Sequence, residues 1–236
     1  MTAHLGRYYT DVETGQQRET DVCASVSSIE SEGMRGGPAM WGHLVIECKS
    51  ARDKPWILFT EEQHSTSEWD RRFTDQRFAL PDPGWLLFTT SPFWDGGPVP
   101  LVNGYRPFGH TLVRALGTGN DDVAYGAVRS VAKAAAGVRI QFRQEAEVLN
   151  VKARAIVFPV LLIDAPLFQC ELDEDGQERL TRIDRGTLVW RYQLASDLPH
   201  ATLVTVITTP ALPDLADDLK LTVASLKRGC DVPPDC

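Results

Sequence analysis

The chain has 236 residues, 43% hydrophobic and 24% charged, so it is long enough to bury a substantial core as one globular domain. Its net charge of −8 excludes a protein that coats nucleic acid by bulk positive charge, because phosphate affinity grows with Lys and Arg contacts. A short basic groove or a partner would have to supply such affinity. No apolar run approaches the roughly 20 residues of a membrane span. Five irregularly placed cysteines and a polar Met1 to Tyr9 segment predict a reducing, cytoplasmic setting.

The first predicted elements are two extended segments, 8–12 and 18–26, joined by a tight turn that contains Gly15. Successive side chains of a strand point to opposite faces. Asp21 is therefore expected to face away from the side that carries Val22.

The middle of the chain is predicted to be strands followed by irregular structure. The β-branched run 44–49 indicates a strand, and 56–60 a shorter one. Residues 64–79, polar with spaced aromatics, are compatible with a helix. Because residues 81–119 are dense in Pro, Gly and aromatic side chains, we expect a loop-rich insertion at about 61–119 within a single domain. Such an insertion is either functional, or simply packed irregular structure.

The clearest predicted helix spans 120–136, with Asn120 as its cap and Gly137 as its stop. The apolar run 155–163 indicates a strand buried on both faces, in which Pro159 predicts a bulge or a break in the ladder. Further strands are predicted at 167–172, 188–194 and 202–208, and a closing helix at 213–227. This order of strands, helix, strands and helix predicts an α/β or α+β fold around a mixed sheet.

Candidate chemical residues lie at the end of the strand 44–49. Glu47 and Lys49 are two residues apart, so both project from one face, roughly 6.6 Å apart along the backbone. Pairing with the segment 18–26 would bring Asp21 opposite Glu47. Two carboxylates suffice for Mg²⁺, which otherwise keeps water and phosphate oxygens, and the metal would activate a bound water. Lys49 would orient that water or stabilise charge developing on phosphorus.

The spacing of Glu47 and Lys49 alone carries little weight. Asp218 and Lys220 repeat it inside a predicted helix, where no second strand supplies another carboxylate. The distinguishing context is an apolar strand that runs into Glu47, preceded by an extended segment that bears Asp21.

A wider pattern extends over residues 8–60. It consists of Tyr8-Tyr9-Thr10-Asp11, Thr14-Gly15, Arg18-Glu19-Thr20-Asp21-Val22 and Leu44-Val45-Ile46-Glu47-Cys48-Lys49, followed by Trp56. These runs resemble the core of the restriction-endonuclease-like, or PD-(D/E)XK, nuclease superfamily. The resemblance implies a mixed central sheet flanked by helices and Mg²⁺-dependent phosphodiester hydrolysis, with Mn²⁺ as a substitute. It also implies catalytic roles for Asp21, Glu47 and Lys49, and a metal-facing main-chain carbonyl at Cys48 whose side chain faces the core.

Two departures from the family pattern stand out. Thr20 occupies the position before Asp21 where the family has proline. The family usually places a helix before the first strand, often with an extra metal-facing Glu, whereas only a handful of residues precede Tyr8. Asp11 or Glu13 is the candidate substitute for that carboxylate.

These features predict a metal-dependent DNA endonuclease in bacterial defence or DNA processing, where this superfamily most often works. The alternative is a nuclease-fold subunit with weak or no catalysis that senses nucleic acid or binds a protein partner; RNA cleavage is a third interpretation. The intact triad favours the first, and the acidic charge favours the second. DNA is the expected partner, with a protein or a second copy of the chain as a further one, and no membrane.

The remaining charged and titratable residues are expected to be less specific. Arg129 and Lys133, one turn apart on the polar face of the predicted helix, would contact a phosphate backbone or, more simply, solvent. The five histidines show no pairing at metal-ligand spacing, so each is expected to be solvated or hydrogen-bonded.

Overall fold

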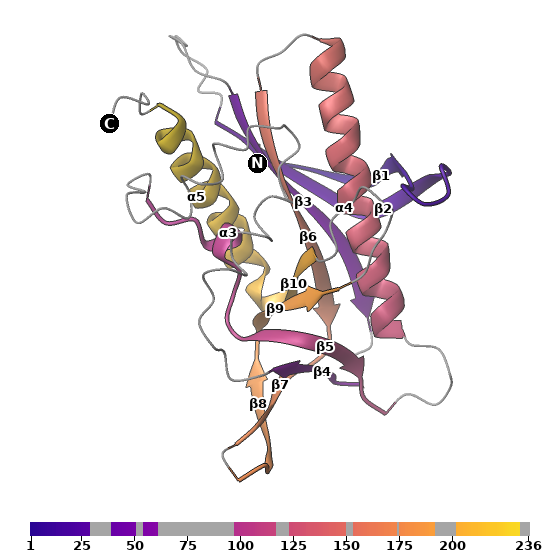
Figure 1. The fold of residues 1–236 in the computed structure, drawn as a ribbon, viewed down its shortest axis with the longest axis vertical. Helices are drawn as coiled ribbons and strands as arrows, with labels where there is room; N and C mark the ends of the chain where they lie inside the picture. The colour runs from indigo at the N-terminus through magenta and orange to yellow at the C-terminus, as the bar shows by residue number, and fades with distance from the viewer. Residues whose placement is uncertain are drawn as a thin grey trace.

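The computed structural model describes residues 1–28, 39–50, 54–60, 97–116, 123–149, 153–173, 175–191 and 202–231. This part of the chain is a mixed α+β fold in which a large mixed sheet is flanked by helices (Figure 1). The mixed sheet with flanking helices is therefore confirmed. The expected helix at 64–79 and the cap at Asn120 lie outside the described residues.

Within the part of the chain that the structure describes, the sheet contains ten strands in the order β1-β2-β3-β6-β10-β9-β5-β4-β7-β8. The strands are β1 (Thr2–Thr10), β2 (Gln17–Ser27), β3 (Ala39–Ser50), β4 (Trp56–Thr60), β5 (Phe108–Arg114), β6 (Ala153–Asp164), β7 (Leu167–Leu172), β8 (Glu178–Ile183), β9 (Arg185–Trp190) and β10 (Thr202–Thr208). The helices in the described residues are α3 (Pro100–Asn103), α4 (Val123–Val148) and α5 (Leu212–Asp231), with the 3₁₀ turn η1 (Thr209–Ala211) before α5. Antiparallel β1, β2 and β3 lead into the parallel pairs β3–β6 and β6–β10 at the centre.

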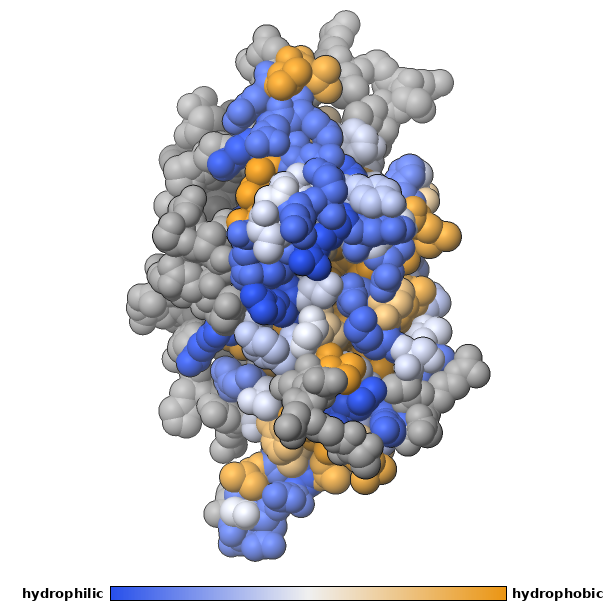
Figure 2. Space-filling model, turned by 90° about the vertical axis from the view of Figure 1, so that its right-hand side faces the viewer, coloured by the Kyte–Doolittle hydropathy of each residue, from blue (hydrophilic) through white to orange (hydrophobic). Residues whose placement is uncertain are grey.

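α4 and α5 cover opposite faces of the sheet (Figure 1). Strand alternation decides which side chain meets which helix: β3 places Val45 in the cluster with α4, and Leu44 and Ile46 in the cluster with α5. The apolar face predicted for α4 is buried: Ala124, Ala127, Val128, Val131 and Ala135. The side of the molecule at the right of Figure 1, where α4 lies, is mainly hydrophilic (Figure 2). No described helix is long and apolar enough to span a membrane.

Most predicted strands are present, some with different ends. The predicted turn between β1 and β2 contains Gly15 at a φ of 69°. The predictions at 56–60, 167–172 and 202–208 coincide with β4, β7 and β10. The strand expected at 188–194 lies instead at Arg185–Trp190 in the described part. β8 was not predicted, because its side chains are largely exposed and charged and leave no apolar pattern.

The expected loop-rich insertion at about 61–119 is described only over residues 97–116. Within it, α3 packs against α5, and β5 pairs with β4 and β9 inside the sheet. The expectation of irregular structure is therefore wrong for β5. Pro107 and Gly109 interrupt the apolar pattern there and make a strand resemble a loop.

Pro159 does not break the ladder between β3 and β6. The parallel register runs without a shift from Ala39↔Ala153 to Ser50↔Asp164 and includes Val45↔Pro159. The pairs with β10 begin one residue later, at Val160. Since proline lacks only the N–H donor, the strand tolerates it where that donor is not needed.

The predicted stop of the long helix at Gly137 is wrong. α4 continues through it to Val148, and Gly137 packs against β1. A Cβ at this position would lie 2.6 Å from Tyr9 Cδ2 and 2.7 Å from the main-chain oxygen of Thr10. The glycine thus serves a close approach of helix and strand.

We expect Gly137→Ala to lower the free energy of unfolding by about 1–3 kcal/mol, because the new Cβ would push β1 away from α4. Gly126 is a matched control in the same helix, since a Cβ there would meet no atom of another described segment within 4 Å. Gly126→Ala should gain up to about 1 kcal/mol from helix propensity. Urea unfolding of both variants measures the difference, and equal effects would contradict a packing role for Gly137.

Candidate functional site

The sheet brings the sequence-predicted residues Asp21, Glu47 and Lys49 together. β2 and β3 are antiparallel, with Val22 opposite Ile46, and one further step in this register sets Asp21 beside Glu47. Asp21 Oδ2 accepts a hydrogen bond from the main-chain N–H of Cys48 at 2.7 Å. The carboxylate from β2 therefore lies directly against the segment of β3 that bears the other two residues.

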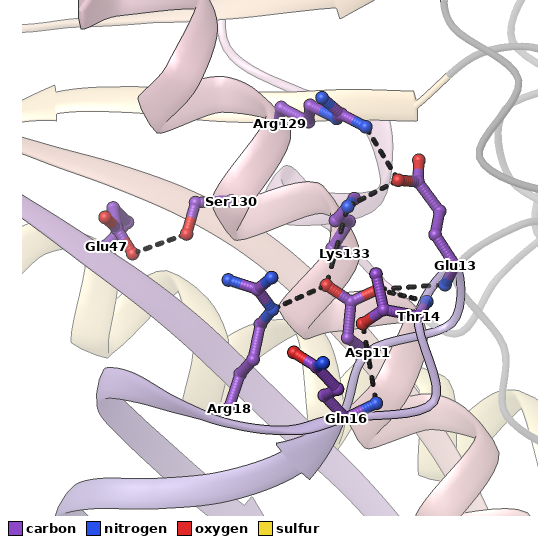
Figure 3. A network of polar contacts seen from close by, with 9 residues as sticks. All are labelled: Asp11, Glu13, Thr14, Gln16, Arg18, Glu47, Arg129, Ser130 and Lys133. Atoms are coloured by element: carbon purple, nitrogen blue, oxygen red, sulfur yellow. Dashed lines mark hydrogen bonds and ion pairs between the residues drawn. The ribbon is translucent and has the colours of Figure 1, made fainter.

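Glu47 is bonded at both of its oxygens. Lys49 Nζ lies 2.6 Å from Oε1. Ser130 Oγ of α4 donates to Oε2 at 3.2 Å, as Figure 3 shows. The Glu47 side chain is 12% exposed and that of Lys49 31%, so the pair is partly shielded from water. The lysine ammonium is thus held beside the carboxylate, as expected for two residues on one face of a strand.

These residues fit a divalent cation in number and chemistry. Asp21, Glu47 and the main-chain carbonyl of Cys48 would supply oxygen ligands, and Mg²⁺ needs only one or two carboxylates when water and phosphate complete its shell. The described residues include no group of three or more His, Cys, Asp or Glu side chains placed to hold a metal. A site here would therefore depend on main-chain and substrate oxygens.

The side chain of Cys48 differs from its expected place. Alternation does put it on the face opposite Glu47, but it is exposed and not in the core. Partial burial of the sulfur and the negative charges of Asp21 and Glu47 raise the pKa of the thiol. Cys48 is thus a neutral thiol on the face of the strand opposite Glu47.

A second charged cluster lies beside the site, where the β1–β2 turn meets α4 (Figure 3). We call it the ionic clamp: Asp11, Glu13 and Arg18 of the hairpin with Arg129 and Lys133 of α4. Asp11 Oδ2 lies 2.8 Å from Arg18 Nε and 3.4 Å from Lys133 Nζ, and Glu13 Oε2 lies 2.6 Å from Arg129 Nη2 and 2.5 Å from Lys133 Nζ. These contacts join the hairpin to the helix.

The carboxylates of the clamp are held in their charged form. Burial alone would raise the pKa of Asp11, but hydrogen bonds from the main-chain N–H groups of Glu13 and Thr14, together with Lys133, bring it below the ordinary value. For Glu13, the hydrogen bond from Lys133 outweighs burial and lowers its pKa as well. Each carboxylate therefore stabilises the fold above its ordinary pKa, and that contribution is lost as the pH falls.

The clamp corrects one expectation. Arg129 and Lys133 are not a solvated face: Lys133 is buried, and both cations pair with Glu13. Asp11 and Glu13, the candidates for an extra metal-facing carboxylate, form these ion pairs. Local sequence could not show this, because Lys133 and Asp11 are 122 residues apart.

The accidental repeat of the motif, Asp218 and Lys220 on α5, has structural contacts. Asp218 Oδ2 accepts from the Tyr105 hydroxyl at 2.6 Å and lies 3.6 Å from Arg185. Lys220 pairs with Asp217 at 2.7 Å on the helix surface. Neither residue meets a carboxylate from a neighbouring strand in these contacts, so the spacing here carries no site.

Sequence reasoning missed two side chains at the site. Ser130 reaches Glu47 from α4, although 83 residues separate them. Tyr9 of β1 is buried against α4. Burial, the charge of Asp11 and, more weakly, that of Glu47 raise the pKa of its hydroxyl, so it stays a neutral phenol. A polar residue next to Arg129 was the only local signal for Ser130, and such residues are common on helices.

His43 differs from the expectation that each histidine is solvated or hydrogen-bonded. It lies on β3 between Trp41 and Phe142, with ring centroids 6.2 and 5.3 Å away. Both ring nitrogens are buried without a hydrogen-bond partner among the described residues. Burial, with a smaller contribution from Arg7, lowers its pKa to about 4.

Comparisons of the chain with protein-family models, with curated proteins and with solved structures found no match. The arguments for a function therefore come from the residues and their geometry.

Proposed function

We propose that the chain is a metal-dependent nuclease of the PD-(D/E)XK type that hydrolyses phosphodiester bonds in DNA. The observation that carries the proposal is the contact between the Asp21 carboxylate and the main chain of Cys48, at the centre of the Glu47-Cys48-Lys49 segment. The family resemblance over residues 8–60 requires that the strand bearing Asp21 lies next to the strand bearing Glu47 and Lys49. A mixed sheet flanked by α4 and α5 supports the restriction-endonuclease-like form of the fold.

The proposed roles follow from the positions of the groups. A divalent cation bound by Asp21, Glu47 and the Cys48 carbonyl would polarise the phosphate and lower the pKa of a bound water. Lys49 holds its ammonium 2.6 Å from Glu47, close to where that water or the developing negative charge would lie. Asp21 keeps one oxygen on the Cys48 N–H, which fixes the carboxylate and leaves its second oxygen for a ligand.

A second candidate function is a nuclease-fold subunit without catalysis. It is favoured by one observation: both Glu47 oxygens already have protein donors, Lys49 and Ser130. A chain in which these contacts persist would bind nucleic acid or a protein without cutting. Cation binding separates the two candidates, because only a nuclease needs it.

A cleavage assay in Mg²⁺ or Mn²⁺ tests the proposal. Its substrates are supercoiled plasmid, linear duplex DNA, single-stranded DNA and, for comparison, RNA. We expect DNA cleavage that EDTA abolishes. Lys49→Ala should slow it by about 100-fold or more, the usual cost of losing a group that stabilises transition-state charge. Lys220→Ala is the matched control, because that exposed lysine has the same sequence spacing but pairs with Asp217 on the surface of α5. It should cleave like the wild type.

Cation binding tests the same site independently of cleavage. Asp21→Asn keeps an oxygen that can accept the Cys48 N–H but loses the charge, so we expect weaker Mn²⁺ binding in calorimetry together with lost cleavage. Lys49→Ala should retain Mn²⁺ binding while losing cleavage. A wild type that neither binds Mn²⁺ nor cuts any substrate would refute the nuclease and favour the non-catalytic subunit.

A further inference from the structure

One side chain of α4 reaches the candidate metal carboxylate across the interface between helix and sheet. Ser130 Oγ donates to Glu47 Oε2 at 3.2 Å, while Lys49 occupies Oε1 (Figure 3 shows the serine contact). With the Glu47 side chain only 12% exposed, water has little access to replace a lost donor. The strand therefore orients one oxygen of the carboxylate and the helix orients the other.

The position of Ser130 is fixed by contacts that neighbouring residues of α4 make with the β1–β2 hairpin. Arg129, the preceding residue, and Lys133, on the same side one turn later, bind the hairpin carboxylates of the ionic clamp. One turn further, Gly137 packs directly on Tyr9 of β1. These contacts set the rotation and the height of α4 over the sheet, so the serine hydroxyl is presented to Glu47 by a rigid element.

We propose that Ser130 is a positioning residue of the candidate metal site, which holds the Glu47 carboxylate in the orientation that lets it share a divalent cation with Asp21. The inference rests on the proposed function. A hydrogen bond from a fixed hydroxyl restricts the rotation of a ligating carboxylate, as outer-shell partners do in metal sites. A serine that only packs α4 on β3 would affect stability and leave cation affinity unchanged.

Mn²⁺ affinity, measured by calorimetry on the folded full chain, tests this role. We expect Ser130→Ala to weaken Mn²⁺ binding by about 10–100-fold, the usual effect of losing an outer-shell partner. Ser130→Thr keeps the hydroxyl and should restore most of the affinity. Alanine favours helix more than serine, so the variant should fold, and Ser130→Cys, with a weaker donor of similar size, should give an intermediate affinity.

Ser225→Ala is the matched control. Ser225 is a buried helix serine on α5 whose hydroxyl accepts from Arg228 at 2.9 Å, away from Glu47. It should bind Mn²⁺ like the wild type even if its melting temperature falls. Unchanged Mn²⁺ affinity in folded Ser130→Ala would overturn the role of Ser130 alone, while the nuclease proposal would stand. A wild type that binds no Mn²⁺ would overturn both.

Discussion

Replacing Asp11 by alanine is expected to lower the free energy of unfolding by about 3–5 kcal/mol, because it removes a buried carboxylate from the buried Lys133 ammonium and from two main-chain N–H donors. The Asp11 side chain is fully buried and contacts Lys133, whose side chain is only 10% exposed, and Arg18. It also accepts hydrogen bonds from the main-chain N–H groups of Glu13 and Thr14. The variant loses the side-chain contacts that Asp11 makes with the turn and with the clamp cations, and urea unfolding at pH 7 measures the loss.

Two further variants separate the loss of the Asp11 charge from the loss of its hydrogen bonds in the turn. Asp11→Asn keeps an oxygen for the two N–H groups but removes the charge, so a smaller loss is expected than with alanine. Arg18→Ala removes a partner whose side chain is 50% exposed, and should cost no more than about 1 kcal/mol. The difference between Asp11→Ala and wild type should shrink as the pH falls below the ordinary pKa of 3.8, because the unfolded wild-type chain then binds a proton that the folded carboxylate resists. A loss below about 1 kcal/mol for Asp11→Ala would contradict the clamp.

The clamp also shows where prediction from sequence reaches its limit. The local sequence pattern is enough to predict the hairpin around Gly15, strand β3 and the apolar face of α4. Strand alternation and helical periodicity can each be recognised within a short stretch of sequence. The contact of Asp21 with β3 followed from a resemblance over residues 8–60 and from strand pairing. The contact of Ser130 with Glu47 depends on how α4 crosses the sheet, which no short window contains.

Errors in the prediction arose where one residue type serves two purposes. The sequence predicts a helix stop at Gly137, yet the residue is a point of close packing, and both uses require the absence of a side chain. Alternation predicts that Cys48 faces the core, because it puts the side chain opposite Glu47, but alternation does not show whether other residues cover that face. The sequence favours solvent contact for Arg129 and Lys133, although the hairpin turn packs over them.

His43 is expected to make the protein lose stability in mild acid. Burial lowers its pKa from 6.5 to about 4, so between these pH values the unfolded chain binds a proton that the folded chain does not. The folded pKa is depressed, so stability falls as the pH drops, by about 3 kcal/mol between about pH 7.5 and 4 at 1.36 kcal/mol per pH unit. Arg7, whose charge also disfavours the imidazolium, acts in the same direction.

His43→Leu should flatten this part of the pH profile. Leucine has a similar volume and needs no hydrogen bonds, whereas both histidine nitrogens are buried without a partner among the described residues, so stability at pH 7 should be equal or higher. His4→Leu, at an exposed position on β1, is the matched control and should keep the wild-type slope. Asp11 and Glu13, whose pKa values are lowered, lose their contributions mainly below about pH 4, so the two acid effects separate along the pH axis. Urea unfolding between about pH 4 and 7.5 measures the slopes, and an unchanged slope in His43→Leu would show that β3 and α4 do not bury a neutral imidazole.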